Sequence, residues 1–191
     1  MIRRVPVAAT LVVLLAVAIM IGLGLWQIDR LHQKEAMITR YTAALALNSD
    51  VAWPRNATER EAGLYRHGSF TCSQVLSQSA MAGRNARGAS GWAHLATCRD
   101  GTGEAQVVLG WSRDPAPVVW NGGAARGFIA GNAKAVRLIA APALAGLQAN
   151  AAPDPRDLPN NHFAYAVQWF LFAATALVIY GIAVRKRLGT A

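Results

Sequence analysis

The sequence predicts a membrane protein of the α+β class, in which two transmembrane helices flank a small external antiparallel β domain. Residues 5–26 and 163–184 are apolar segments of 22 residues without a charge, and a spanning helix needs about 20 such residues. Basic residues border the two segments at the ends of the chain. Between the segments, short runs rich in aromatic and β-branched residues alternate with Gly turns, which is typical of a β domain.

The basic flanks predict the topology. Arg3 and Arg4 precede the first segment, and residues 185–187 are Arg, Lys and Arg. Short loops rich in Lys and Arg stay on the cytoplasmic side. We therefore expect cytoplasmic ends at residues 1–4 and 185–191, transmembrane helices at 5–26 and 162–184, and an external domain at 27–161.

The charge distribution argues against a nucleic-acid partner. The chain has a net charge of +9, but its central part, with 14 basic and 10 acidic residues, has a net charge of only +4. More than half of the excess therefore lies in the membrane flanks, and no basic stripe with interleaved aromatic residues is present.

A cleaved signal peptide is the alternative for the first segment. Residues 16–18 (Ala-Val-Ala) have the small-x-small pattern of a cleavage site. The apolar run continues to Trp26, however, whereas a cleavable apolar region has about 7–15 residues. The length favours a retained anchor.

The central domain should begin with a helix and continue as a sheet. Apolar residues at helical spacing predict a helix over 27–46. Turn signals then separate five expected strands and favour an antiparallel meander or small barrel. The strands are expected at 64–71, 74–80, 91–97, 104–111 and 124–130, with a loop at 83–90 and, at 141–159, a Pro-rich linker that includes a short helix at 143–148.

The two cysteines allow a disulfide. Cys72 and Cys98 fall at the ends of the first and third expected strands, which lie at the same edge of a meander. An external domain is exposed to an oxidising compartment, which favours the bond over two free buried thiols.

His162 is the most informative single residue. It follows Asn160 and Asn161 at the point where the polar chain enters the second apolar segment. An imidazole there can ligate a metal or haem iron. It can equally cap the helix or anchor it at the membrane interface, and the residues by themselves leave both roles open.

Two terminal motifs resemble the surfeit locus protein one family. Residues 23–34 (LGLWQIDRLHQK) are similar to the family's Leu-Gly-x-Trp-Gln-x-x-Arg-x-x-x-Lys exit of the first helix. Residues 161–170 (NHFAYAVQWF) resemble its Asn-His-x-x-Tyr-Ala-x-x-Trp-Phe second helix. Residues 65–70 and 107–111 are similar to the external sheet, although Leu109 stands where the family usually has Arg.

The resemblance implies an assembly factor for haem-copper cytochrome c oxidase in a bacterial inner (plasma) membrane. Such a factor would handle haem a, as a transient cofactor, for insertion into the oxidase catalytic subunit. Its expected partners are that subunit, the haem a synthesis machinery and membrane lipid. His162 corresponds to the second-helix His that is the natural candidate ligand for haem iron.

Helical spacing extends the candidate haem site beyond His162. Ala166 and Trp169 follow it at i+4 and i+7, on the same helix face. Arg30 on the first helix lies on the same outer side and could pair with a haem propionate. Tyr165 and Trp26 complete the candidate set, although Trp26, Tyr165 and Trp169 are more often interfacial anchors, and Arg30 could face solvent or phospholipid.

No sequence motif indicates an enzyme. A nucleophile elbow, a phosphate loop and a His-Glu-x-x-His pair are all missing from the sequence. Ser112, Asp114 and His94 have the residue types of a triad, but the sequence does not define their geometry. The alternatives to an assembly factor are a stable accessory subunit of an oxidase or respiratory supercomplex without its own haem, a ligand sensor, which would need a cytoplasmic output domain, and, last, a hydrolase.

Overall fold

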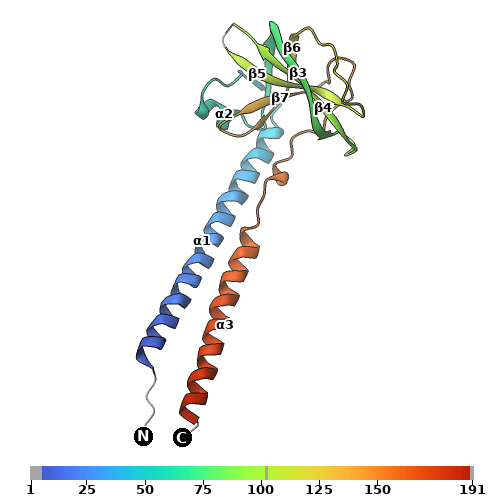
Figure 1. Cartoon of the computed structure of the whole chain (residues 1–191). Coiled ribbons are helices and arrows are strands. Elements are labelled where there is room, and N and C mark those ends of the chain that lie inside the picture. Colours follow the sequence, from blue (N-terminus) through green and yellow to red (C-terminus); the bar gives the residue numbers. More distant parts are fainter. Residues whose placement is uncertain (1–5, 102, 190–191) are drawn as a thin grey trace. The chain divides into compact units, whose positions relative to one another are not determined.

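The computed structural model describes residues 6–101 and 103–189, which divide into two compact units (Figure 1). The described part of the helical unit comprises residues 6–37 and 158–189. The sheet unit comprises residues 38–157.

Two long helices, α1 (Val7–Leu45) and α3 (His162–Gly189), carry the apolar segments. The predicted first anchor and the predicted helix that follows it are one continuous helix of 39 residues. It extends this far because no proline occurs between Val7 and Pro54. Both helices are long and apolar enough to cross a membrane.

The sheet unit contains a seven-stranded sheet in the order β1-β2-β6-β7-β5-β4-β3. A short helix α2 (Ala57–Gly63) precedes β2, and a single 3-10 turn, η1 (Pro155–Asp157), ends the unit. The strands are β1 (Asp50–Val51), β2 (His67–Cys72), β3 (Gln74–Arg84), β4 (Ser90–Arg99), β5 (Glu104–Ser112), β6 (Gly123–Gly131) and β7 (Val136–Ala140).

The sheet is mixed, so the prediction of an antiparallel sheet was wrong. The expected meander is present as β3-β4-β5. The hairpin of β6 and β7, however, inserts between β2 and β5, and β7 then runs parallel to β5. β1 is also parallel to β2. Neither β7 nor β1 was expected, because a partner distant in sequence decides each pairing.

Three local predictions also need correction. Residues 64–66 are not part of a strand: Leu64 caps α2, and Tyr65 has a φ of 62°. Residues 83–84 belong to β3 rather than to a loop. Residues 143–148 form a bend and a turn and end at the bridge residue Gln148 instead of forming a helix. The rest of the Pro-rich linker is irregular apart from bends, η1 and the bridge residue Asn150.

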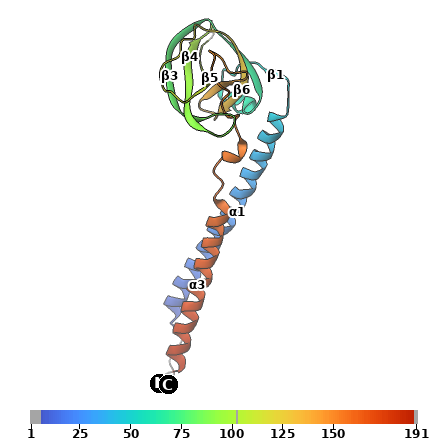
Figure 2. The same ribbon diagram turned by 90° about the vertical axis from the view of Figure 1, so that its right-hand side faces the viewer.

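The sheet is strongly curled (Figure 2). Only Ser73 separates β2 from β3, although these strands lie near opposite ends of the strand order. The Cys72–Cys98 disulfide forms at this corner, with the two Cα atoms 5.3 Å apart, and confirms the predicted bond. The curled sheet encloses a core that includes Phe70, Val107, Leu109, Ile129 and Leu138.

Candidate functional site

The two helices of the helical unit pack against each other in opposite directions. Thr10 on α1 hydrogen-bonds the Tyr180 hydroxyl near the end of α3. At the other end of the pair, Gln27 meets His162. Val7 and Gly189 consequently lie at the same end of the helix pair (Figure 1).

The α1 contact face follows a repeat of three and four residues. Val17 and Gly24 are buried, and half-buried residues continue the pattern at positions 10, 13, 20 and 27. This spacing is the seam of a left-handed helix pair. Gly24 is required there because a Cβ atom would lie 2.6 Å from Phe170 Cε1, whereas Gly22 faces open space. The close approach of the two helices therefore depends on Gly24 and not on Gly22.

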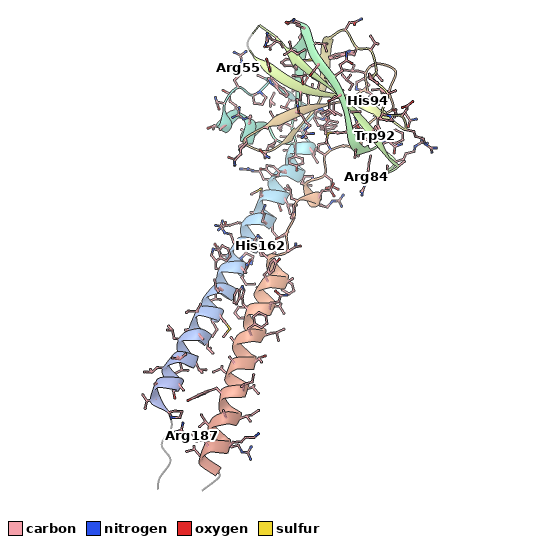
Figure 3. All side chains as sticks on the ribbon, viewed as in Figure 1. Arg55, Arg84, Trp92, His94, His162 and Arg187 are labelled. Carbon is pink, nitrogen blue, oxygen red and sulfur yellow. A yellow bond between two sulfur atoms is a disulfide. The ribbon has the colours of Figure 1, made fainter. Side chains whose placement is uncertain are left out.

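His162 is the first residue of α3 and contacts α1 (Figure 3). Its Nδ1 lies 2.7 Å from the Oε1 atom of Gln27. An amide oxygen only accepts hydrogen bonds, so Nδ1 carries the hydrogen and donates it. In the neutral ring, Nε2 then has a free lone pair, which is the form that binds a metal.

Asn160 and Asn161, the polar residues before His162, make no hydrogen bond to its imidazole ring in the described chain. Asn161 supplies its backbone carbonyl to the Tyr165 N–H at 3.2 Å, which starts the helix. The side-chain Oδ1 of Asn160 is buried and has no hydrogen-bond partner among the described residues. The predicted capping role therefore belongs to the backbone of Asn161, and the imidazole is directed to Gln27.

The i, i+4, i+7 face predicted on α3 is present. Ala166 is 1 % exposed, and both His162 and Trp169 are half-buried. Trp169 also makes an edge contact with Phe172, at 6.1 Å between ring centroids. The imidazole of His162 and the indole of Trp169 therefore lie, with the small Ala166 between them, on the side of α3 that packs against α1. Tyr165 does not join them, because it is 49 % exposed on the surface of the helix.

Arg30 and Trp26 form a separate pair on α1. The Arg30 guanidinium carbon lies 5.5 Å from the centroid of the Trp26 ring. Arg30 also donates to Gln33 Oε1 at 2.9 Å. Arg30 makes no ion pair within residues 6–101 and 103–189. Since Arg30 follows Gln27 by three residues, it lies one helical turn beyond the His162 contact.

Sequence reasoning did not include Gln27, the hydrogen-bond partner of His162, among the candidate site residues. It was visible as a constant part of the first-helix motif, but its importance depends on the pairing of two helices 135 residues apart. A polar residue at a seam position of an apolar helix was the available signal.

A second buried polar group lies in the sheet unit. His94 is 1 % exposed, and its Nε2 lies 2.8 Å from Ser112 Oγ. Ser112 Oγ donates to the Asp114 carbonyl at 2.5 Å, so His94 must donate its Nε2 hydrogen to Ser112. The Asp114 carboxylate accepts from Ala116 N instead of His94. This arrangement is the reverse of an activated serine, in which His accepts the hydroxyl hydrogen.

A multidentate metal centre is also missing from the described residues, which contain no cluster of three His, Cys, Asp or Glu side chains. A single imidazole with a free Nε2 can still act as an axial ligand to haem iron.

A known protein family matches most of the chain. The model of the SURF1 family, the surfeit locus protein one family named above, matches residues 14–174. The match begins in α1, includes the whole sheet unit and ends in α3 beyond Trp169. None of the curated proteins compared with the chain matches it.

Proposed function

The chain belongs to the SURF1 family, which is associated with cytochrome oxidase assembly, and on that premise we propose that it handles haem a for insertion into the oxidase catalytic subunit. The single observation that carries the proposal is the His162–Gln27 pair. It leaves the imidazole Nε2 without a hydrogen-bond partner among the residues that the structure describes, at the end of a packed helix pair.

The residues at the site fit a haem. His162 would ligate the iron, and Gln27 would hold the imidazole in the ligating tautomer. Arg30, which has no acidic partner in the described chain, would pair with a propionate. Trp169 and the more exposed Trp26 offer aromatic surface, whereas Tyr165 would have no part in the site.

When bound, haem a supplies an iron centre and a redox-active macrocycle that the oxidase needs. The protein supplies one ligand, a cation and a partly apolar surface. A haem that is held by a single protein ligand is suited to transient binding, since fewer bonds must break when the haem is passed to another protein. The expected partners are consequently the haem a synthesis machinery, as donor, and the catalytic subunit, as acceptor.

The proposed location is a bacterial inner membrane, with both chain ends in the cytoplasm and the sheet unit in the periplasm. The antiparallel helix pair supports two ends on one side. Exposed apolar side chains cover much of both helices, as lipid contact requires. The disulfide supports an oxidising compartment for the sheet unit.

The test is an absorption spectrum of the detergent-purified full chain after co-expression with haem a synthesis. We expect a haem a spectrum in the wild type and its loss in His162→Ala. His32→Ala is the matched control, because His32 is exposed on α1 and the hydrogen-bond partner of His162 on that helix is Gln27. Loss of the spectrum in both variants would indicate a general defect and contradict a ligand role for His162.

Gln27 provides a second arm of the same test. Removing an outer partner of a ligating His typically weakens metal binding by about 10–100-fold, and we expect Gln27→Ala to do so for haem a. Gln27→Glu retains an acceptor for Nδ1 and should restore binding. A colourless wild-type protein that co-purifies with mature oxidase at fixed stoichiometry would overturn the haem role and favour a stable accessory subunit.

A further inference from the structure

A pocket in the sheet unit has no role in the haem proposal and has the composition of a ligand site. Its volume is about 500 Å³, within the range of about 300–1,000 Å³ for small-molecule sites. It lies at the end of the curled sheet where the β4–β5 and β6–β7 turns come together. Ligand sites occur preferentially at the mouths of β-barrels, and the end of a curled sheet is the comparable position.

The floor of the pocket is apolar. Phe70 and Ala105 belong to the core of the sheet, and half-buried Val136 packs against that core. Trp53 meets Phe70 edge to face, at 5.4 Å between ring centroids, and forms one wall. A ligand body in contact with these groups would therefore have to be aliphatic or aromatic.

Three cations surround this floor: Arg55, Arg60 and Lys134. Arg60 is fixed in place, since its Nε donates to the Ala133 carbonyl at 2.9 Å and its Nη1 to the Arg55 carbonyl at 3.4 Å. The bond to Ala133 ties α2 to the β6–β7 turn.

The other two cations are available to a ligand. Lys134 projects from a turn held by Asn132 Oδ1, which accepts from the backbone N–H groups of Lys134 and Ala135. Its ammonium group makes no hydrogen bond or ion pair within the described chain. The Arg55 guanidinium (labelled in Figure 3) makes none either. The pKa of nearby Glu59 is lowered mainly by the hydrogen bond from the Arg55 backbone N–H, and the charge of the guanidinium adds the smallest contribution.

The acidic residues at the pocket are already engaged. Glu104 pairs with Arg99 at 2.6 Å. Asp100 Oδ1 accepts from the Gly103 N–H at 2.8 Å, within the β4–β5 turn. Glu104 is thus offset by Arg99, and the three cations outnumber the remaining carboxylate, Asp100. The net charge at the mouth is therefore positive, and an anionic group is the complement that the described residues leave unmet.

We propose that this pocket binds a small amphipathic carboxylate, whose apolar body lies against Trp53 and Phe70 and whose acid group pairs with Lys134 and Arg55. The proposal concerns a site separate from His162 and stands whether or not the chain handles haem a. It adds a ligand-binding activity to the sheet unit.

The test is fluorine NMR of the full chain in micelles of an uncharged detergent, with two probes of the same shape. 4-Fluorobenzoate carries the acid group, and 4-fluorobenzamide is neutral. We expect the benzoate signal to broaden on addition of protein, beyond its broadening in micelles alone, and the benzamide signal to broaden much less.

Substitutions of the pocket cations test whether the benzoate binds in this pocket. Lys134→Ala and Arg55→Ala should each weaken benzoate binding by about fivefold, which is the effect of a partly solvated charge pair. Arg113→Ala is the matched control, since Arg113 is exposed and lies outside the pocket. Equal broadening of the two probes, no broadening at all, or equal losses in Arg113→Ala and the pocket variants would each overturn the proposal.

Discussion

Reduction of the Cys72–Cys98 disulfide should destabilise the sheet unit by several kcal/mol. The bond joins residues 26 positions apart in the sequence. In the chain-entropy account, closing a loop of that length removes about 12 cal/mol/K from the unfolded ensemble. At 25 °C this corresponds to about 3.5 kcal/mol, which is a large part of the stability of a small domain.

The assay is urea unfolding of the detergent-solubilised chain, followed by fluorescence of buried Trp111, with and without a reductant. For an m-value of about 2 kcal/mol/M, the midpoint should fall by roughly 1.7 M on reduction. The variant Cys72→Ala/Cys98→Ala should lose more than reduced wild type, because both sulfurs are buried and their removal leaves cavities.

A midpoint shift below about 0.5 M in chains verified as reduced would refute the reasoning. It would mean that the unfolded state is already restricted at this corner, or that β2 and β3 stay together without the covalent link. The single residue between those strands makes the second explanation testable by inserting a Gly-Ser linker after Ser73.

The remaining predictions concern packing and protonation. Gly127→Ala should cost more than about 3 kcal/mol in urea unfolding, because the new Cβ would lie 1.9 Å from the backbone oxygen of Ile139, which cannot move alone. Gly24→Leu should separate the helices at Phe170, lower the thermal midpoint and increase the distance between spin labels placed on α1 and α3. Burial raises the pKa of Tyr65; its contribution to stability is therefore fully present below pH 10 and should be lost as the pH rises through the folded-state pKa.

Each of these predictions has a matched control. Gly101→Ala and Gly22→Leu place new atoms in open space and should have little effect on packing. Tyr65→Phe removes the titrating group and should remove its share of the alkaline loss of stability. If Gly22→Leu separates the helices as much as Gly24→Leu does, the inferred seam is wrong. If Tyr65→Phe leaves the alkaline profile unchanged, burial of that phenol does not govern it.

Local sequence signals predicted the parts of the fold that depend on neighbours along the chain. Two uncharged apolar segments predicted α1 and α3, and turn signals between the expected strands predicted the separation of β4 from β5. Strands β3, β4, β5 and β6 were each found within a few residues of their expected positions. Periodicity and turn chemistry are local properties, so they can be recognised without knowledge of the fold.

The mixed sheet could not be predicted in this way. β7 (Val136–Ala140) is a short apolar run whose direction relative to β5 depends on where the whole β6–β7 hairpin inserts. Its two partner strands, β6 and β5, lie on opposite sides of it in the sheet and come from different parts of the sequence. No pattern within the strand distinguishes parallel from antiparallel pairing.

The sequence by itself determined the two apolar helices, the β-rich unit between them, the family resemblance and His162 as the candidate ligand. Only the tertiary structure decided that His162 contacts Gln27, that Gly24 rather than Gly22 permits the helix contact, and that three cations gather around an apolar pocket. The physical reason is that hydrogen-bond direction, close packing and charge complementarity depend on distances between atoms, and the sequence specifies those distances only for residues that are near one another along the chain.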